Sequence, residues 1–531
     1  MRRGGRIDLR RARHRAREGG LHAVHLLGGR PGLHGAAQGR VQPDRPLQPR
    51  QDVPDPQDVR RGRCRGLPAA PHRREGTRPA LLARAAPAAE VVLLDKLRSI
   101  VGPANLLAGV DLSPYVVDGR TPEAAVFPGS LDETRAVVEL AASAGVPIVP
   151  WGGGTAAAVG APPSRPGLVL GLGRLGRLVE HEPGDLTATV QAGMTVAALQ
   201  SALRARGQWL SLDPPDPGRA TIGGVLAANA SGPRRHLYGT ARDLLIGVTV
   251  VTGDGAVVRG GGKVVKNVAG YDLPKLFVGS HGTLGVIVEA TLKLRPVADV
   301  ERLVAVRFDR VKDAGAAARA VMGSDLVPTA LDLLDGEAAR AMAEAGERGR
   351  PPGALLAVGF DGLAEQVDWQ CGELGRVTGP LGGSRVVTLP GAAWDALGSA
   401  APRAVDPPAA VVRLVVMPAQ VADVMEQAAG AARARGLVAA VSAHAGVGVL
   451  TAALGTQGAP EPATVAAVLQ EWRAMARAGG GHATLESAPL AVKAQVPAWD
   501  DPGAAGRIMK AIKAQLDPRG ILNPGRFVAG I

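Results

Sequence analysis

The sequence predicts an α+β protein with two folded parts behind an N-terminal segment that forms no core. Residues 91 to 298 alternate short β-rich runs with glycine-rich turns, whereas residues 301 to 480 alternate β-rich runs with alanine-rich helices. Residues 1 to 90 contain no Phe, Tyr or Trp. Because a chain of 531 residues is too long for one hydrophobic core, we expect domains at 91–298 and 299–505 and a C-terminal segment at 506–531.

The N-terminal segment, residues 1 to 90, is predicted to be disordered. It holds 20 Arg, no Lys and 8 acidic residues, which is +12 of the net charge of +13. So few apolar side chains cannot offset the entropy lost on folding. Three origins stay open: an arginine-rich arm for an anionic partner, a transit peptide, or an out-of-frame translation of the end of a neighbouring gene for a sister protein. A tryptic peptide from before Glu90 in the native protein would exclude the last.

The rest of the chain argues against several classes of protein. With 61 − 20 = 41 basic and 48 − 8 = 40 acidic groups, it is nearly neutral, which disfavours nucleic acid as a partner. No run reaches the roughly 18 apolar residues of a membrane helix. Cys64 and Cys371 are the only cysteines, too few for a disulfide framework or an iron–sulfur cluster. We therefore expect a cytoplasmic protein without a metal site.

The folded region begins with a strand, helix, strand and glycine turn. Ser130 is a suitable helix N-cap with Glu133 completing a capping box, Gly145 ends the helix, and residues 146–149 form a buried strand. The turn Gly152-Gly153-Gly154-Thr155 follows directly. Its successive N–H groups predict either a pyrophosphate cradle or a plain tight turn.

Residues 168 to 291 combine short strands with an unusually long irregular connection. Gly253-Asp254-Gly255 between β-rich runs indicates a hairpin. The connection around TIGGVLAANASG, from Thr221 to Gly232, is long enough to be functional. The run GGKVVKNVAGYDLPKLFVGSHGTLGV, residues 261–286, places glycine-rich backbone where it can approach a large flat ligand closely.

Together these motifs resemble a known family. The motifs that carry the resemblance are GGGT at 152, TIGG at 221, SGPRR at 231, KNVAGYDLPKL at 266, GTLGV at 282 and LDPRGILNPGRF at 516. The chain resembles the FAD-binding subunits of bacterial glycolate oxidase that accompany a catalytic sister flavoprotein. These subunits belong to the vanillyl-alcohol-oxidase superfamily. The likeness is strong over residues 100 to 300 and in the tail, and loose over 301 to 480. It implies a two-lobed PCMH-type FAD-binding domain, and the pattern beyond residue 298 favours a ferredoxin-like α+β cap.

The resemblance implies which residues hold FAD. Trp151-Gly-Gly-Gly-Thr has neither the His nor the Cys that binds flavin covalently in many relatives, so non-covalent FAD is expected. The implied contacts are Gly152, Gly153, Gly154 and Thr155 at the pyrophosphate, Thr221, Gly223, Gly224 and Ser231 along the ribityl chain and isoalloxazine, and Gly282, Leu284, Gly285 and Val286 at the adenine end.

Oxidation of a 2-hydroxy acid also requires a base and a cation for the carboxylate. Arg234 and Arg235 are candidates for a clamp that binds the substrate carboxylate, and His444 and His482 are candidates for the base. Each also has a structural interpretation, as a solvated arginine or a core histidine. Further candidates are His236, Arg242, Lys266 and Tyr271, whereas His281 also fits a surface position at the end of a strand.

Two functions stay open from the sequence. In the first, this chain oxidises glycolate or D-lactate and passes electrons to an iron–sulfur subunit. In the second, it binds FAD without catalysing, beside a catalytic sister FAD subunit; the SAHAGVGVL segment, which lacks the Asp and Asn of the corresponding sister-subunit segment, slightly favours this. Either complex allows association with the inner face of the membrane through the partner subunits.

Overall fold

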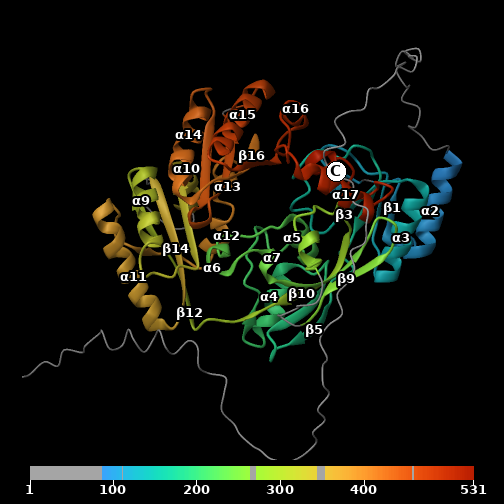
Figure 1. Ribbon diagram of the computed structural model, residues 1–531, viewed down its shortest axis with the longest axis horizontal. Coiled ribbons are helices and arrows are strands. Elements are labelled where there is room, and N and C mark those ends of the chain that lie inside the picture. The colour runs from blue at the N-terminus through green and yellow to red at the C-terminus, as the bar shows by residue number, and fades with distance from the viewer. Residues whose placement is uncertain (1–86, 111, 264–270, 344–352, 457, 459) are drawn as a thin grey trace, which may run out of the picture. The chain divides into compact units, whose positions relative to one another are not determined.

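The computed structural model describes residues 87–110, 112–263, 271–343, 353–456, 458 and 460–531 (Figure 1). The predicted disorder of residues 1 to 90 falls almost wholly outside this range. Lys266 and most of the KNVAGYD motif also lie outside the described residues. Within the described residues, no helix is long and apolar enough to cross a membrane.

The first lobe of the glycine-rich part is a small sheet covered by two helices. Strands β2, β4 and β3 are parallel, and β1 pairs with β2 in the antiparallel sense. Leu97 and Val137 from the two helices pack on Leu168 of β4 in one core. The bounds are β1 (Leu106–Ala108), β2 (Ala124–Val126), β3 (Ile148–Trp151), β4 (Leu168–Gly171), α2 (Pro87–Val101) and α3 (Leu131–Ala144).

Helix α3 begins and ends where the sequence predicts. The hydroxyl of Ser130 accepts from the Glu133 amide at 3.0 Å, and the Glu133 carboxylate accepts from the Gly129 amide at 2.7 Å. Gly145 then ends the helix with a positive φ of 67°. The following strand, β3, therefore delivers the glycine turn to the edge of this sheet.

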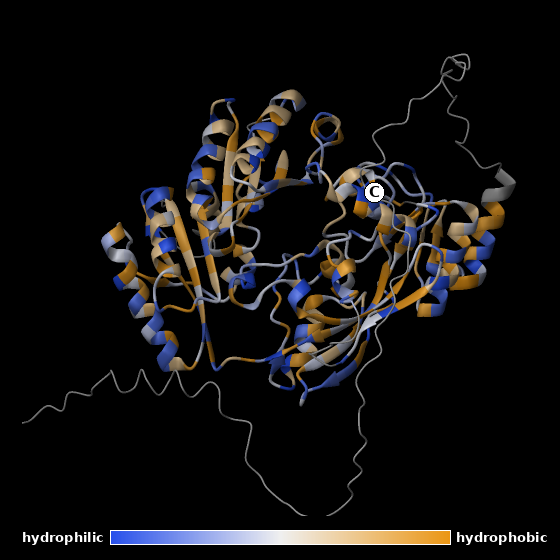
Figure 2. Ribbon diagram, in the orientation of Figure 1, coloured by the Kyte–Doolittle hydropathy of each residue, from blue (hydrophilic) through white to orange (hydrophobic). Residues whose placement is uncertain are grey.

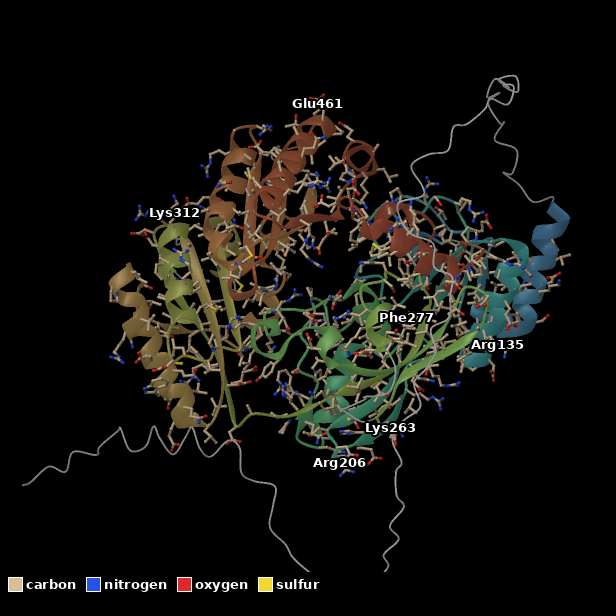
Figure 3. All side chains as sticks on the ribbon, in the orientation of Figure 1. Arg135, Arg206, Lys263, Phe277, Lys312 and Glu461 are labelled. Atoms are coloured by element: carbon tan, nitrogen blue, oxygen red, sulfur yellow. The ribbon has the colours of Figure 1, made fainter. Side chains whose placement is uncertain are left out.

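The second lobe is a five-stranded antiparallel sheet in the order β5-β6-β10-β8-β9. The predicted hairpin at Gly253 to Gly255 joins β8 to β9. Figure 3 shows Phe277 inside this lobe, whereas Lys263 lies at its edge. The bounds are β5 (Leu178–Glu182), β6 (Thr187–Gln191), β8 (Leu245–Val251), β9 (Val257–Gly261), β10 (Val286–Lys293), the small pair β7 (Gln208–Trp209) and β11 (Arg295–Pro296), and helices α4 (Val196–Arg204), α5 (Ile222–Ala228), α6 (Arg235–Tyr238), α7 (Ala241–Leu244) and α8 (Pro274–Phe277).

The part of the chain after the two lobes forms an eight-stranded antiparallel sheet, which we call the cap sheet. Its strand order is β15-β12-β14-β13-β17-β18-β16-β19. Helices α9, α11, α14 and α15 cover one face, and α10, α12 and α13 cover part of the other. Its strands are mostly orange between helices that carry blue outer faces (Figure 2), as expected when both faces are buried. The α+β class predicted from the sequence is confirmed.

The strands of the cap sheet are β12 (Val300–Phe308), β13 (Ala330–Asp335), β14 (Ala354–Gly362), β15 (Val387–Thr388), β16 (Ala410–Val415), β17 (Val438–His444), β18 (Val449–Gly455) and β19 (His482–Ser487). Its helices are α9 (Val311–Met322), α10 (Gly336–Ala343), α11 (Ala364–Thr378), α12 (Ala393–Leu397), α13 (Ala400–Ala404), α14 (Val421–Arg433) and α15 (Pro462–Ala478).

The C-terminal segment returns to the first lobe. After α16 (Leu490–Lys493), helix α17 (Ala505–Leu516) ends before Pro518, and Leu522 forms a parallel bridge with Ile148 of β3. Lys513 donates to Thr283 O at 2.7 Å and pairs with the buried Asp517 at 2.5 Å. Figure 1 shows the C-terminus beside α17 and β3. The exact domain boundaries at 90, 298 and 505 stay predictions.

Candidate active site

Three glycine-rich turns that are far apart in the sequence line one cavity. The first turn follows β3, the second holds the start of α5, and the third precedes β10. Thr221 caps α5, with its hydroxyl accepting from the Gly224 amide at 3.3 Å. The predicted FAD contacts that line this cavity are Gly152, Gly153, Gly154, Thr155, Thr221, Gly223, Gly224, Gly282 and Gly285.

The first turn fits a pyrophosphate. A Cβ at Gly153 would lie 1.8 Å from the main-chain oxygen of Arg219, and one at Gly152 would lie 2.1 Å from the Thr221 hydroxyl, so only glycine allows this close approach. Among the described residues, no acceptor takes a hydrogen bond from the amides of residues 152 to 156. A row of free amides in a turn is an anion-binding nest, which favours the phosphate cradle over the plain tight turn.

The remaining three predicted contacts lie elsewhere. Ser231 lines a neighbouring cavity, and its buried hydroxyl accepts from the Ala241 amide at 3.2 Å. Leu284 and Val286 line neither cavity, because their side chains pack into the cores of the two lobes. Asn523 and Arg526 of the tail line the first cavity although the sequence did not single them out. The LNPGRF motif was the available signal for both.

Arg526 links the tail to the first turn. Its buried guanidinium donates to the main-chain oxygen of Val159 at 2.9 Å and to that of Ala161 at 3.3 Å. Asn523 donates to His281 O at 2.6 Å, while its Oδ1 is buried without a partner among the described residues. The tail therefore forms one wall of the cavity and leaves an acceptor free for a ligand.

A second cavity of about 480 Å³ adjoins the first. Both are lined by Gly154, Thr155, Gly224 and His281, so a ligand in one cavity reaches the edge of the other. The opposite wall is the uncovered part of the cap sheet. It carries Arg413, His444, Thr451, Thr484 and Glu486.

His444 forms a pair with Asp332 on this wall. The two residues lie directly opposite each other on β17 and β13, and Nδ1 of His444 is 3.0 Å from both carboxylate oxygens. Asp332 is 1% exposed. A carboxylate at Nδ1 fixes the tautomer with the proton on that nitrogen, leaving Nε2 as an acceptor. The sequence missed Asp332, because it lies 112 residues before its partner.

The two predicted clamp arginines face different surroundings. Arg234 is held by Glu301 at 2.6 Å and Asp213 at 3.5 Å, and its guanidinium lies 3.8 Å from the ring centre of Trp394. It lines a different groove from the cavity that holds His444. The groups around Arg234 are those of a structural arginine, so the clamp is not shared by both residues.

Arg235 lines the cavity that holds His444. Its guanidinium donates to the main-chain oxygens of Ser231 and Gly232 and has no carboxylate partner among the described residues. Burial, and then the nearby charge of Arg413, lowers its pKa to about 10. It therefore remains a cation at neutral pH, and no carboxylate of the described residues forms an ion pair with it.

The other candidates are dispersed. His482 is exposed at the start of the edge strand β19 and lines neither cavity. His236 is half-buried and lines neither cavity, and burial lowers its pKa. Tyr271 is 94% exposed, and Arg242 donates to Lys275 O at 3.1 Å away from both cavities.

His281 lies between the two cavities instead of at a surface. It has a φ of 50°, and its ring is 5.2 Å from that of Trp499 and 5.5 Å from that of Phe527. Burial, and then the charges of Arg526 and Arg413, lowers its pKa to about 4. The imidazole is therefore neutral at physiological pH. No group of His, Cys, Asp and Glu among the described residues has the arrangement of a metal site.

Two family models match the chain. Residues 122–261 match the FAD binding domain, and residues 297–527 match the C-terminal domain of FAD linked oxidases. Glycolate oxidase subunit GlcD of Bacillus subtilis is 29% identical over 456 residues, which is 82% of this chain and 96% of that relative.

Two other relatives match over a shorter range. D-2-hydroxyglutarate dehydrogenase of Xanthomonas citri is 41% identical over 38% of this chain and 43% of its own length. D-lactate dehydrogenase of Archaeoglobus fulgidus is 35% identical over 46% of this chain and 55% of its own length. The alignments therefore span less than two thirds of these two relatives.

Solved structures share the fold at low identity. Alkyldihydroxyacetonephosphate synthase has a TM-score of 0.64 at 19% identity, covering 84% of this chain and 86% of that one. p-Cresol methylhydroxylase has a TM-score of 0.66 at 18% identity, covering 83% and 97%. Together with the two family models, these likenesses confirm the predicted two-lobed FAD-binding fold with an α+β cap.

Proposed function

Because the chain is an FAD-linked oxidoreductase that joins an FAD-binding domain to the C-terminal domain of FAD-linked oxidases, we propose that it oxidises the hydroxyl-bearing carbon of a 2-hydroxy acid. The observation that carries this proposal is Arg235, a partly buried cation that lines the second cavity without a carboxylate partner among the described residues. A substrate carboxylate is the anion that completes this site.

The pair of His444 and Asp332 supplies the base in this proposal. Nε2 of His444 accepts the proton of the substrate hydroxyl, and Asp332, bonded to Nδ1, stabilises the imidazolium that results. Bound FAD supplies the hydride acceptor. Arg235 fixes the carboxylate end, which orients the hydroxyl toward His444 and the carbon-bound hydrogen toward the first cavity.

The proposed FAD contacts are the glycine turns that line the first cavity. The free amides of residues 152 to 156 hold the pyrophosphate, Thr221 caps the short helix beside the ring system, and Asn523 offers its unpartnered Oδ1. None of the three turns carries a Cys, and the neutral His281 contacts the ring of Trp499 edge-on and the ring of Phe527 at a tilt. We propose that FAD is bound without a covalent link.

The electrons leave to a partner in this proposal. Iron–sulfur clusters are held by about four cysteines, whereas the chain has only Cys64 and Cys371. Together with the likeness to a glycolate oxidase subunit, this supports an iron–sulfur partner and a sister flavoprotein subunit. Glycolate and D-lactate are the first substrates to test, because two of the relatives are a glycolate oxidase subunit that aligns with 82% of this chain and a D-lactate dehydrogenase that aligns with 46% of it.

Anaerobic rapid mixing of the FAD-loaded chain with glycolate or D-lactate tests the proposal. Bleaching of the flavin absorbance by either acid, together with its loss in Arg235→Met and His444→Gln, is the expected result. A flavin that stays oxidised with both acids and with D-2-hydroxyglutarate would contradict catalysis by this chain. It would leave the alternative, a non-catalytic FAD-binding partner of a sister subunit.

A further inference from the structure

Three neighbouring strands of the cap sheet place a row of polar side chains in the second cavity. Thr451 of β18, Arg413 of β16 and Thr484 of β19 are directly opposite one another in the strand register. Directly opposite residues project from the same face of a sheet, and all three line the cavity. Arg413 is therefore the central cation of this wall.

Glu486 lies on the same wall, at a point where the pairing of β19 with β16 contains an extra residue. Leu485 pairs with Val412 and Ser487 pairs with Val411, so Glu486 is an extra residue between two ladder pairs. Side chains alternate along a strand, so Glu486, two residues after Thr484, projects from the same face, and bulges are frequent beside active sites. On this face Glu486 forms an ion pair with Arg413, with 19% of the glutamate side chain exposed.

The charges that line this cavity leave one cation in excess. Arg219 pairs with Asp216 at 3.4 Å on the rim, and Arg413 pairs with Glu486. Arg235 has no acidic partner among the described residues. The buried Asp332 lies behind His444, outside the cavity wall. The wall therefore matches one carboxylate and offers no second unpaired cation.

We infer that Glu486 restricts the site to 2-hydroxy acids with a single carboxylate, an inference that rests on the proposed function. A second carboxylate would require Arg413 as its partner, but Glu486 already occupies that guanidinium. The entering diacid would also meet the negative charge of Glu486 at close range, which disfavours it. Selectivity for substrates with one carboxylate then comes from the Glu486 carboxylate, which occupies Arg413, the site that a second substrate carboxylate would need.

Ligand binding to the FAD-loaded chain tests this inference independently of turnover. Propionate and succinate lack the reactive hydroxyl, and their affinities are measured by perturbation of the flavin absorbance. Glu486→Gln frees Arg413, so we expect the succinate-to-propionate affinity ratio to rise about tenfold to hundredfold, the range of a charge-assisted hydrogen bond. The ratio of kcat/KM for D-malate over D-lactate should rise in parallel.

Two further variants isolate the cause. The double variant Arg413→Gln with Glu486→Gln removes both charges and should keep the wild-type ratio, because no second guanidinium is freed. Glu471→Gln, at a surface pair with Arg435, should also keep it. A ratio within twofold of wild type in Glu486→Gln, with FAD content and melting temperature retained, overturns the inference. Absence of flavin reduction by any 2-hydroxy acid would contradict the proposed function alone.

Discussion

Replacing Arg235 by Met tests the central element of the proposed chemistry. The variant keeps an unbranched apolar side chain but removes the only cation of the second cavity that lacks an acidic partner among the described residues. A guanidinium with a pKa of about 10 is charged at pH 7. Its loss leaves a bound carboxylate in a half-buried site without its counter-charge.

The magnitude follows from the contacts that the arginine makes. A hydrogen bond to a charged group contributes about 1.5–3 kcal/mol, and a forked pair contributes roughly twice that; Arg413 cannot replace it, because Glu486 occupies that guanidinium. At about 1.4 kcal/mol per factor of ten, kcat/KM should fall roughly 10²- to 10⁴-fold. In Arg235→Lys, kcat/KM should fall less far, because lysine keeps the positive charge and loses only the forked pair of hydrogen bonds that a guanidinium makes.

Anaerobic stopped-flow reduction of the flavin measures this effect, with FAD content and melting temperature recorded for each variant. The matched control is Arg234→Met, whose guanidinium is bound by Glu301 and Asp213 outside the cavity. That variant should lower the melting temperature and change kcat/KM by less than about fivefold. If Arg235→Met reduces flavin within threefold of wild type while folded and loaded, the carboxylate does not bind at Arg235.

Three further predictions concern the base, the cofactor and pH. His444→Gln should lower the flavin reduction rate by about 10²- to 10⁴-fold with FAD binding unchanged; a loss below tenfold would exclude it as the base. Gly153→Ala should purify without FAD, because its Cβ would lie 1.8 Å from Arg219 O, whereas Gly173→Ala, with no atom within 4 Å, should retain FAD on acid precipitation and spectroscopy. The neutral native His281, with its pKa near 4, makes the free energy of unfolding fall as pH drops from 6.5 to 4, by at most about 3 kcal/mol. Chemical unfolding of His281→Asn across that range should show a flatter pH dependence, and an unchanged slope would contradict this assignment.

The sequence predicts the elements whose signals are local. The cap residue Ser130, the acid Glu133 and the stop at Gly145 each act within a few positions, and helix α3 begins and ends at them. The glycine turns are also recognisable, because a close backbone approach excludes every other residue. The GTLG turn shows how far such a prediction reaches. Gly282 and Gly285 line the cavity as predicted, whereas the side chains of Leu284 and Val286 pack into the cores of the two lobes.

The chemical part of the site could not be predicted in the same way. Asp332 meets His444 only because β13 and β17 pair in one register, and a shift of one residue would turn both side chains to the opposite face. The apparent loss of acidic residues around His444 in the sequence therefore did not mean that the histidine lacks a carboxylate. The carboxylate comes from a distant strand.

The site is complete only where the FAD-binding part and the cap meet, since Arg235 belongs to α6 and His444 to the cap sheet. The neighbours of Arg235 fix this arrangement. Arg234 binds Glu301 and Tyr238 binds Asp361, and these two acids are directly opposite each other on β12 and β14. The short helix that carries the clamp is thus held at both ends by one pair of cap strands. Because Tyr238 makes its own bond to Asp361, the loss of Arg234 alone leaves one of the two links, and the carboxylate site should stay in place beside the base.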